Sequence, residues 1–305
     1  MLYDLNIAWS PATSQDRLLQ TLSLAASLGY DSVALNHTLE LPLPGNPTSP
    51  FPELPPPSST LRLPNVLRRA TFALADPAAS NYRLQNLSSV YDILAIRPLT
   101  EKAFQNACIT LDIPLISLDM TQHFPFHFRP KPCMAAVSRG VRFEMCYSQA
   151  LAADQRGRAN FISNATSLVR ATRGRGIILS SEAKSALGLR APADVVNLSY
   201  IWGLPTEKAL EGMRSIPRSV VKNEGLKRNG FRGVIDIVQV ATRATAQGMD
   251  VERSDEGSSA PERAGNKKDK SQKRKNGDDT QPMSKRQAKK MKLAARSAPP
   301  PKEAA

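Results

Sequence analysis

Residues 164–183 read NATSLVRATRGRGIILSSEA, and this stretch decides the fold. A helical pattern of apolar residues runs over residues 151–172, and GIIL at residues 176–179 follows it as a short, continuously apolar strand. A strand that is apolar on both faces is typical of a parallel sheet covered by helices. The stretch therefore predicts one helix and strand unit of an α/β fold.

The same alternation extends from this unit through about the first 240 residues. Six further apolar runs are predicted strands, at residues 2–8, 32–35, 69–74, 93–96, 115–118 and 142–146. Helical patterns lie between most of them, most clearly at residues 101–111. Seven strands alternating with helices favour a (β/α) TIM-like barrel, incomplete at about seven strands. A doubly wound open sheet is the alternative, because periodicity does not show whether a sheet closes.

Two regions depart from the alternation. A proline-rich loop insertion occupies residues 39–66, with nine prolines between positions 39 and 64, so an extended surface loop is predicted where a crossover helix would stand. Residues 246–305 are rich in Ser, Gly, Pro and Lys and cannot bury enough apolar surface to fold. We therefore predict a barrel domain at residues 1–245 and a disordered basic tail at residues 246–305.

Composition excludes several classes of protein. No apolar stretch is long enough to span a membrane, and the N-terminus lacks the basic region of a secretory signal. Cys108, Cys133 and Cys146 are far apart and form no C-x-x-C pair, which favours a reducing compartment over a disulfide framework or a Cys-rich zinc site. His123 and His127 are four apart, but Pro125 between them argues against a helix that would place both on one zinc ion.

Positive charge points to a polyanionic partner. The 305 residues carry 41 Lys and Arg against 27 Asp and Glu, a net charge of +14, of which +6 falls on residues 250–305. Two dense basic clusters in this tail predict a nuclear localisation signal, at Lys267, Lys268, Lys273, Arg274, Lys275, Lys285, Arg286, Lys289, Lys290 and Lys292. A tail that only improves solubility is the alternative.

In a barrel, function gathers at the C-terminal ends of the strands. The polar residues expected there are poor in metal ligands; they are Asn6, Asn36, His37, Arg97, Asp119, Glu144, Ser148, Ser180 and Ser181. Asp4, Asp119 and Glu144 would hold Mg²⁺ only loosely, and scattered carboxylates inside a barrel more often pair with arginines. We therefore predict no catalytic residue, no metal site and no cofactor.

The chain resembles the TIM-barrel protein subunit of nuclear ribonuclease P and ribonuclease MRP, the ribonuclease P subunit 30 family. The resemblance covers about residues 1–240 and rests on GYDSVALNH at 29–37, YDILAIRPLTEKAFQNAC at 91–108, LDIPLISLDM at 111–120, RGVRFEMCYS at 139–148, NATSLVRATRGRGIILSSEA at 164–183 and LRAPADVVNLSYIWGL at 189–204. It implies a non-catalytic, nuclear and nucleolar subunit of a ribonucleoprotein whose RNA removes the 5′ leader of precursor tRNA. A related particle processes rRNA precursors.

The resemblance also implies partners: the catalytic RNA, precursor tRNA indirectly, a small α/β protein subunit, further subunits and no membrane. Arginines suit phosphate contacts, and the predicted RNA-binding set is Arg68, Arg69, Arg97, Arg156, Arg158, Arg170, Arg173 and Arg175. Cations at the end of a helix also stabilise its dipole, so a structural role stays open. The aromatic segment Phe124, Phe126 and Phe128 is predicted to bind a protein partner, with burial in the core as the equal alternative.

Two other functions remain open at this point. Distantly similar barrels are metal-dependent phosphoesterases whose first strand ends in His-x-His, but Asp4-Leu5-Asn6 stands there in this chain, which disfavours that activity. The chain would otherwise be a nonspecific nucleic-acid binder that acts through its tail.

Overall fold

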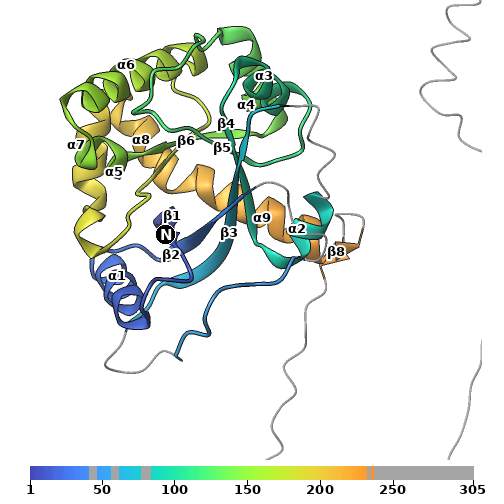
Figure 1. Ribbon diagram of the computed structural model, residues 1–305, viewed down its shortest axis with the longest axis vertical. Helices are drawn as coiled ribbons and strands as arrows, with labels where there is room; N and C mark the ends of the chain where they lie inside the picture. The colour runs from blue at the N-terminus through green and yellow to red at the C-terminus, as the bar shows by residue number, and fades with distance from the viewer. Residues whose placement is uncertain (41–46, 56–61, 77–83, 232–234, 237–305) are drawn as a thin grey trace, which may run out of the picture. The chain divides into compact units, whose positions relative to one another are not determined.

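The computed structural model describes residues 1–40, 47–55, 62–76, 84–231 and 235–236. Seven parallel strands form one sheet whose spatial order follows the order of the chain, as Figure 1 shows. They are β1 (Tyr3–Trp9), β2 (Ser32–Leu39), β3 (Asn65–Leu74), β4 (Ile93–Pro98), β5 (Leu115–Ser117), β6 (Arg142–Cys146) and β7 (Ile177–Ser180). All seven predicted strands are confirmed, although β2 and β3 extend further than predicted.

The sheet nearly closes on itself. The backbone amide of Ala8 donates to the carbonyl of Ala183 over 3.0 Å, and the amide of Glu182 donates to the carbonyl of Asn6 over 2.6 Å. An isolated parallel bridge between Ile7 and Ala183 completes this seam. A doubly wound sheet would reverse its strand order part-way, so the chain-ordered sheet excludes that alternative and confirms the TIM-like barrel.

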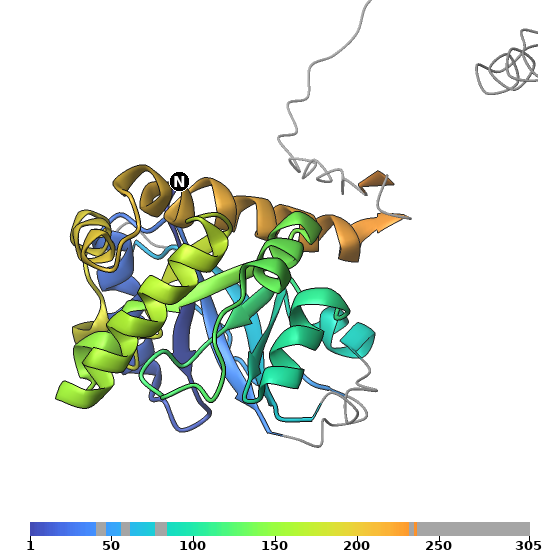
Figure 2. The ribbon, with the colours of Figure 1, turned by 90° about the horizontal axis from the view of Figure 1, so that it is seen from above.

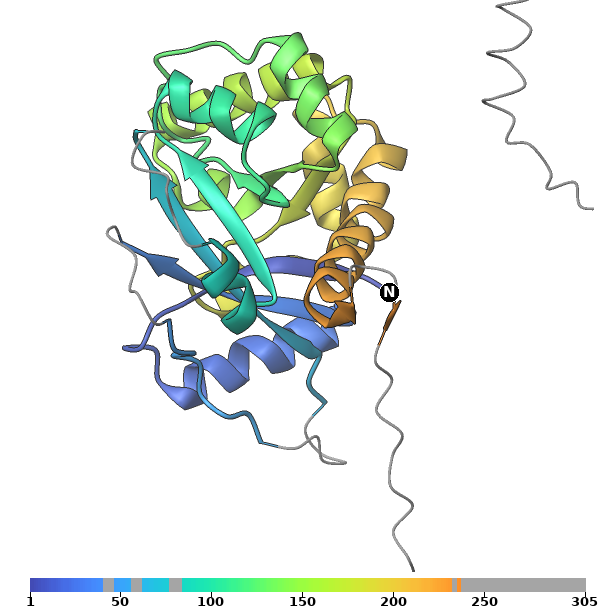
Figure 3. The same ribbon diagram turned by 90° about the vertical axis from the view of Figure 1, so that its right-hand side faces the viewer.

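Helices surround the strands, as Figure 3 shows. Up to β7 they are α1 (Gln15–Ser27), α2 (Leu84–Val90), α3 (Glu101–Ile109), α4 (Pro130–Arg139), α5 (Tyr147–Ala152) and α6 (Gln155–Thr172). After β7 come the 3-10 helix η2 (Ala186–Gly188), α7 (Pro192–Ile201), α8 (Thr206–Met213), α9 (Ser215–Asn229) and a short antiparallel pair, β8 (Gly230–Phe231) and β9 (Ile235–Asp236).

The long helix predicted over residues 151–172 is two helices in the structure. The break falls at Asp154, whose backbone is extended and whose side chain accepts a hydrogen bond from the amide of Gly157 over 2.7 Å. A carboxylate at this N-cap position satisfies a backbone donor that the helix itself leaves unpaired. Asp154 therefore starts a new helix, α6.

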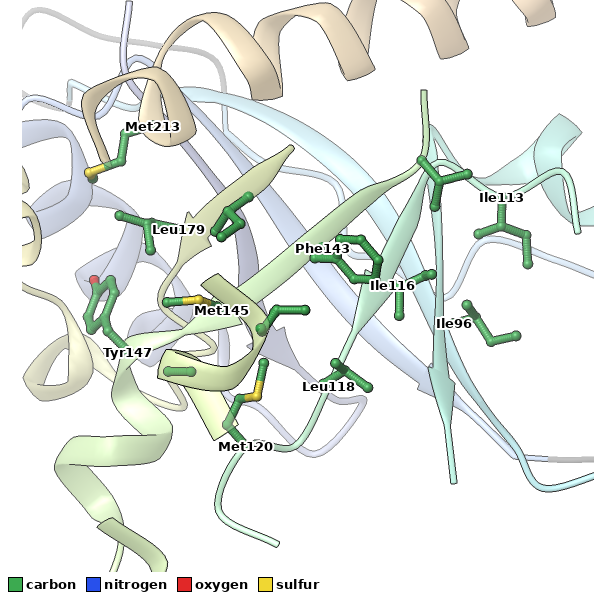
Figure 4. Packing of buried hydrophobic residues seen from close by; sticks show 14 of the residues in the cluster. Ile96, Ile113, Ile116, Leu118, Met120, Phe143, Met145, Tyr147, Leu179 and Met213 are labelled. Atoms are coloured by element: carbon green, nitrogen blue, oxygen red, sulfur yellow. The ribbon is translucent and has the colours of Figure 1, made fainter. Parts of the chain in front are cut away.

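Two apolar clusters lie on opposite sides of the strands. Outward-facing side chains pack under the helices, and Figure 4 shows several of them, including Ile96, Ile116, Phe143, Met145 and Leu179. The inward-facing cluster consists of Tyr3, Leu5, Ala34, Ile93, Ala95, Leu115, Ile178 and Val220. Val220 belongs to α9, which crosses one end of the strands in Figure 2. Helix α9 therefore caps the interior at that end.

The connection between β2 and β3 contains no helix in its described residues, which are 40, 47–55 and 62–64, and the other residues of the predicted loop insertion between the two strands lie outside the described residues. Phe51 of this connection packs on the barrel. Its ring centroid lies 4.8 Å from that of Trp9, 6.0 Å from that of Tyr91 and 6.4 Å from that of His37. One aromatic ring therefore covers apolar surface that a crossover helix would otherwise cover.

The predicted domain boundary at residue 245, the basic tail and the residues of its nuclear localisation signal lie outside the described residues. Among the helices that the structure describes, none combines the length and the apolar character needed to cross a membrane.

Gly212 allows α8 to approach β7 closely. A Cβ atom at this position would lie 2.8 Å from the carbonyl oxygen of Ile177, so we expect Gly212→Ala to lower the free energy of unfolding by about 1–3 kcal/mol. Gly225 of α9 is a matched control because a Cβ atom there meets nothing within 4 Å. Gly225→Ala is expected to raise stability by up to about 1 kcal/mol, since alanine favours helices. Equal effects of the two changes in urea unfolding would contradict this account.

Candidate nucleic-acid interface

A polar network fills the centre of the barrel. Arg69 on β3 and Glu144 on β6 are both fully buried, and the Arg69 Nη1 to Glu144 Oε1 distance is 2.5 Å. Asn6 donates to Glu144 over 3.2 Å and accepts from Asn36 over 2.9 Å. Thr71 donates to Asn36 over 2.7 Å and accepts from Arg69 over 3.2 Å. This ring of hydrogen bonds ties β1, β2, β3 and β6 together.

The network sets the ionisation of its members. Burial alone would raise the pKa of Glu144, but the Arg69 guanidinium outweighs burial and holds that pKa below its ordinary value. Asp4 lies nearby without an arginine. Burial raises the pKa of Asp4 to about 6, against the hydrogen bonds that its Oδ1 accepts from the amides of Asn6 and Ser181. Its Oδ2 is buried and has no hydrogen-bond partner among the residues that the structure describes.

The carboxylates considered as metal ligands do not converge. Glu144 is neutralised by Arg69, Asp4 accepts from Ser181, and Asp119 accepts from the Thr121 hydroxyl over 2.6 Å. In the described part of the chain, no three His, Cys, Asp or Glu side chains gather closely enough to hold a metal ion. Of the three carboxylates, Glu144 pairs with an arginine, as expected for a carboxylate inside a barrel.

Three of the eight predicted RNA-binding arginines are paired with carboxylates. The prediction for Arg69 is wrong, because its side chain is fully buried against Glu144 and no phosphate can reach it. Arg97 is half-buried and its Nη2 lies 2.8 Å from Glu182 Oε1. Arg68 is exposed but pairs with Asp92, with a 3.4 Å distance between Arg68 Nε and Asp92 Oδ2. Their charge is therefore largely compensated within the protein.

The other five arginines are exposed and form no ion pair with any residue that the structure describes; they are Arg156, Arg158, Arg170, Arg173 and Arg175. The first two lie in the first turn of α6, and the last three lie at its end. The 18 residues of α6 span about 27 Å, so the structure separates these arginines into two groups. These two groups are the cations best placed to bind phosphate.

The aromatic segment belongs mainly to the core. Phe126 and Phe128 are only 6% and 8% exposed, and both pack on Phe104 of α3, with ring centroids 5.2 and 5.5 Å apart. The prediction that these two bind a partner is therefore corrected to burial. Phe124 is half-buried and leans on the other two rings, so part of its surface stays open.

A cleft of about 870 Å³ opens at the C-terminal ends of the strands, where a barrel places its ligand sites. Half-buried Arg97 and Glu182 line it together with exposed Arg156 and Lys184. Glu182 has a left-handed backbone, with φ of 55°, which is costly for a residue other than glycine. Its carboxylate accepts from Arg97 over 2.8 Å and from Gln149 over 2.5 Å. These two contacts join Glu182 to β4 and to α5 beside the cleft.

A second groove, of about 360 Å³, runs between α6 and the loop at residues 121–129. Its walls carry aromatic rings, amides and hydroxyls; they include Phe124, His127, Asn160, Ser163, Asn164, Ser167 and Arg170. His123 and Asn160 line both the cleft and the groove, so the two hollows adjoin. The sequence did not predict this groove. It predicted that the arginines and the phenylalanines bind partners, but not that they lie side by side.

Comparison with known proteins shows the family to which the barrel belongs. The sequence model of the RNase P subunit p30 family matches residues 1–229, which include all seven strands of the barrel. The chain belongs to the RNase P subunit p30 family. This membership confirms the resemblance drawn from the sequence motifs.

Relatives from three eukaryotes match most of the chain. The probable ribonuclease P protein subunit 3 of Schizosaccharomyces pombe is 35% identical over 237 residues, which cover 77% of this chain and 99% of that protein. The ribonuclease P protein subunit p30 of Mus musculus is 35% identical over 224 residues, 70% of this chain and 83% of that protein. The ribonuclease P/MRP protein subunit RPP1 of Saccharomyces cerevisiae is 30% identical over 255 residues, 77% and 84% of the two chains.

The p30 family fold also occurs in a solved structure. A chain in the cryo-EM structure of archaeal ribonuclease P with mature tRNA superposes with a TM-score of 0.55 at 12% identity, covering 79% of this chain and all of that one. At this identity, the likeness establishes the shared fold alone.

Removing one member of the buried ion pair leaves an uncompensated charge. We expect Glu144→Leu to lower the free energy of unfolding by about 3–5 kcal/mol. Arg68→Ala, which removes an exposed member of a neighbouring pair, is the matched control and is expected to cost less than about 1 kcal/mol. Denaturant unfolding measures both, and a Glu144→Leu effect no larger than that of Arg68→Ala would show that the interior pair does not stabilise the barrel.

Asp4 makes stability depend on pH. The unfolded chain ionises Asp4 near its ordinary pKa of 3.8, whereas the folded protein does so only near 6. The protonated Asp4 side chain therefore stabilises the folded protein below pH 4. This stabilisation, about 3 kcal/mol in the free energy of unfolding, is lost as the pH rises through 6. Asp4→Asn removes this loss. Its free energy of unfolding relative to wild type should rise by about that amount between pH 4 and pH 7, and a difference independent of pH would refute this assignment.

Proposed function

We propose that the chain is a non-catalytic, RNA-binding protein subunit of nuclear ribonuclease P, which removes the 5′ leader of precursor tRNA, and of ribonuclease MRP, which processes rRNA precursors. The observation that carries the proposal is the family match over the whole barrel. The centre of the barrel supports a non-catalytic role, because a salt bridge and its hydrogen bonds occupy the inward-facing positions of four strands. Chemistry in the particle then belongs to the RNA subunit.

What the protein supplies under this proposal is positive charge at fixed positions. A folded RNA is a dense polyanion, and arginine donates two hydrogen bonds to one phosphate without losing its proton. The five unpaired arginines of residues 156–175 are the proposed contacts to the catalytic RNA, since no carboxylate among the described residues competes for them. Precursor tRNA is then reached through that RNA.

The further partners are a small α/β protein subunit and other subunits of the same particle. The relatives from yeasts and mouse are named as subunits of ribonuclease P or of ribonuclease P/MRP, which supports assembly of this kind. We place the protein in the nucleus and nucleolus, directed there by the two basic clusters between Lys267 and Lys292.

Isolation of the tagged full-length protein from nuclei tests this function. We expect one structured RNA to be enriched with it, and the eluate to cleave the 5′ leader of a precursor tRNA until micrococcal nuclease destroys the RNA. Cleavage that survives nuclease, or the absence of any enriched RNA, would contradict the proposal and favour a protein active site at the barrel carboxylates.

A variant that lacks residues 250–305 is the control for nonspecific binding by the tail. Fused to an independent nuclear localisation signal, it should still recover the same RNA, with a weaker dependence of binding on salt because fewer phosphates are neutralised. Loss of all particle association by this variant in the nucleus would place the function in the tail instead of the barrel.

A further inference from the structure

The cleft and the groove form one path along α6. The cleft lies at the C-terminal ends of the strands and includes Arg156, and the groove continues from it past Asn160 to Arg170. Arg173 and Arg175 follow directly where α6 ends. Arg156 and the three arginines at the end of α6, about 20 Å apart along the helix, therefore stand at the two ends of a single path. Figure 1 shows α6 on the outside of the barrel.

Hydrogen bonds within the protein form the path before any ligand binds. The Asn160 amide donates to the carbonyl of Thr121 over 3.0 Å, and the Asn164 amide donates to the carbonyls of Met120 and Gln122 over 2.8 and 2.9 Å. These bonds fasten the loop to α6. A preformed groove loses little conformational entropy when it is filled.

The walls of the groove attract a polyanion, because they include Arg170 and no carboxylate. Residues 155–175 contain five arginines and no Asp or Glu, and residues 120–131 of the facing loop contain no Asp or Glu either. Acidic side chains do line the cleft, but Asp119, Asp154 and Glu182 are hydrogen-bonded to Thr121, Gly157 and Arg97. The charge pattern therefore favours a chain of phosphates over a peptide.

Aromatic rings in the groove favour a second kind of contact, the stacking of bases. Phe124 is half-buried, while His123 and His127 beside it are exposed. Rings of this kind stack on bases, but only on bases that are not already stacked and paired within a helix. Ser163 and Ser167 are exposed between the rings and Arg170, and among the described residues neither side chain has a hydrogen-bond partner that would occupy it. A groove of about 360 Å³ accepts single bases and is too small for a duplex.

From these features we propose that an unpaired strand of RNA lies along α6. Its phosphates contact Arg156 at one end and Arg170, Arg173 and Arg175 at the other, and at least one base stacks on Phe124 in the groove. At the spacing of about 3.4 Å between stacked nucleotides, the length of α6 accommodates on the order of eight nucleotides. The inference rests on the proposed function, and it adds the form of RNA and the surface that binds it.

Ultraviolet crosslinking of the purified particle tests where the RNA lies. We expect nucleotide adducts on peptides from residues 121–129 and 155–175. If the RNA copurifies but its adducts fall only on other surfaces, the strand does not lie along α6, although the subunit function stands. If no RNA copurifies, the subunit function itself fails. Adducts of a neighbouring protein on these peptides, found with a chemical crosslinker in place of nucleotide adducts, would assign the groove to a protein partner.

Binding by the recombinant full-length chain tests the recognition of an unpaired strand. The probe is a fluorescent ten-nucleotide unpaired RNA, with excess unlabelled RNA duplex present to occupy the basic tail. Phe124→Leu keeps the apolar contact but removes the stacking ring, and we expect it to weaken binding about tenfold. Arg170→Ala should weaken binding about threefold, because it removes one phosphate contact.

Arg218→Ala is the matched control for charge. Arg218 of α9 is exposed but lines neither the cleft nor the groove, so its loss should change binding less than about twofold. Equal losses for Arg218→Ala and Arg170→Ala, no effect of Phe124→Leu, or complete displacement of the probe by the duplex would overturn the inference. Thermal unfolding of each variant separates a loss of binding from a loss of fold.

Discussion

The buried ion pair between Arg69 and Glu144 is the constraint on which the rest of the barrel depends. Removing two charges from water costs several kcal/mol for each ion, and only close contact with full hydrogen bonding offsets that cost. The neighbouring positions supply those hydrogen bonds: Asn6, Asn36 and Thr71, on three different strands, all bond into the same ring. The pair thus fixes which side chains can point inward at the middle of the barrel, and Arg69 occupies the carboxylate of Glu144.

The alternation of apolar strands with helices predicted the fold well, because a strand buried on both faces leaves a strong local pattern. The pattern could not show which of two adjacent arginines points inward. Arg68 and Arg69 are neighbours on β3, so the strand sends their side chains to opposite faces, and only the partner on β6 reveals that Arg69 is the buried one. Two phenylalanines, Phe126 and Phe128, were misassigned for a similar reason, since their contact with Phe104 joins segments more than 20 residues apart.

The candidate interface was predictable only in part. Its arginines stand out in the sequence because residues 155–175 contain no acidic residue. The groove does not stand out in the sequence, because it forms only where the loop at residues 121–129 contacts α6 through the Asn160 and Asn164 amides. A structural role at the end of α6 does not prevent a contact with a ligand: Arg173 ends the helix in a left-handed conformation, and its side chain is exposed.

The seam between β1 and the residues after β7 has a consequence for synthesis on the ribosome. Asp4 and Asn6 belong to the first strand made, but their partners Ser181 and Glu144 follow 177 and 138 residues later. The nascent chain therefore carries Arg69 without its counter-ion, and β1 without its second neighbour, until most of the barrel has been translated. Contacts of such long range form slowly, and in the meantime they expose apolar strands to association with other chains. The barrel can therefore close only after residues 181–183 have been translated.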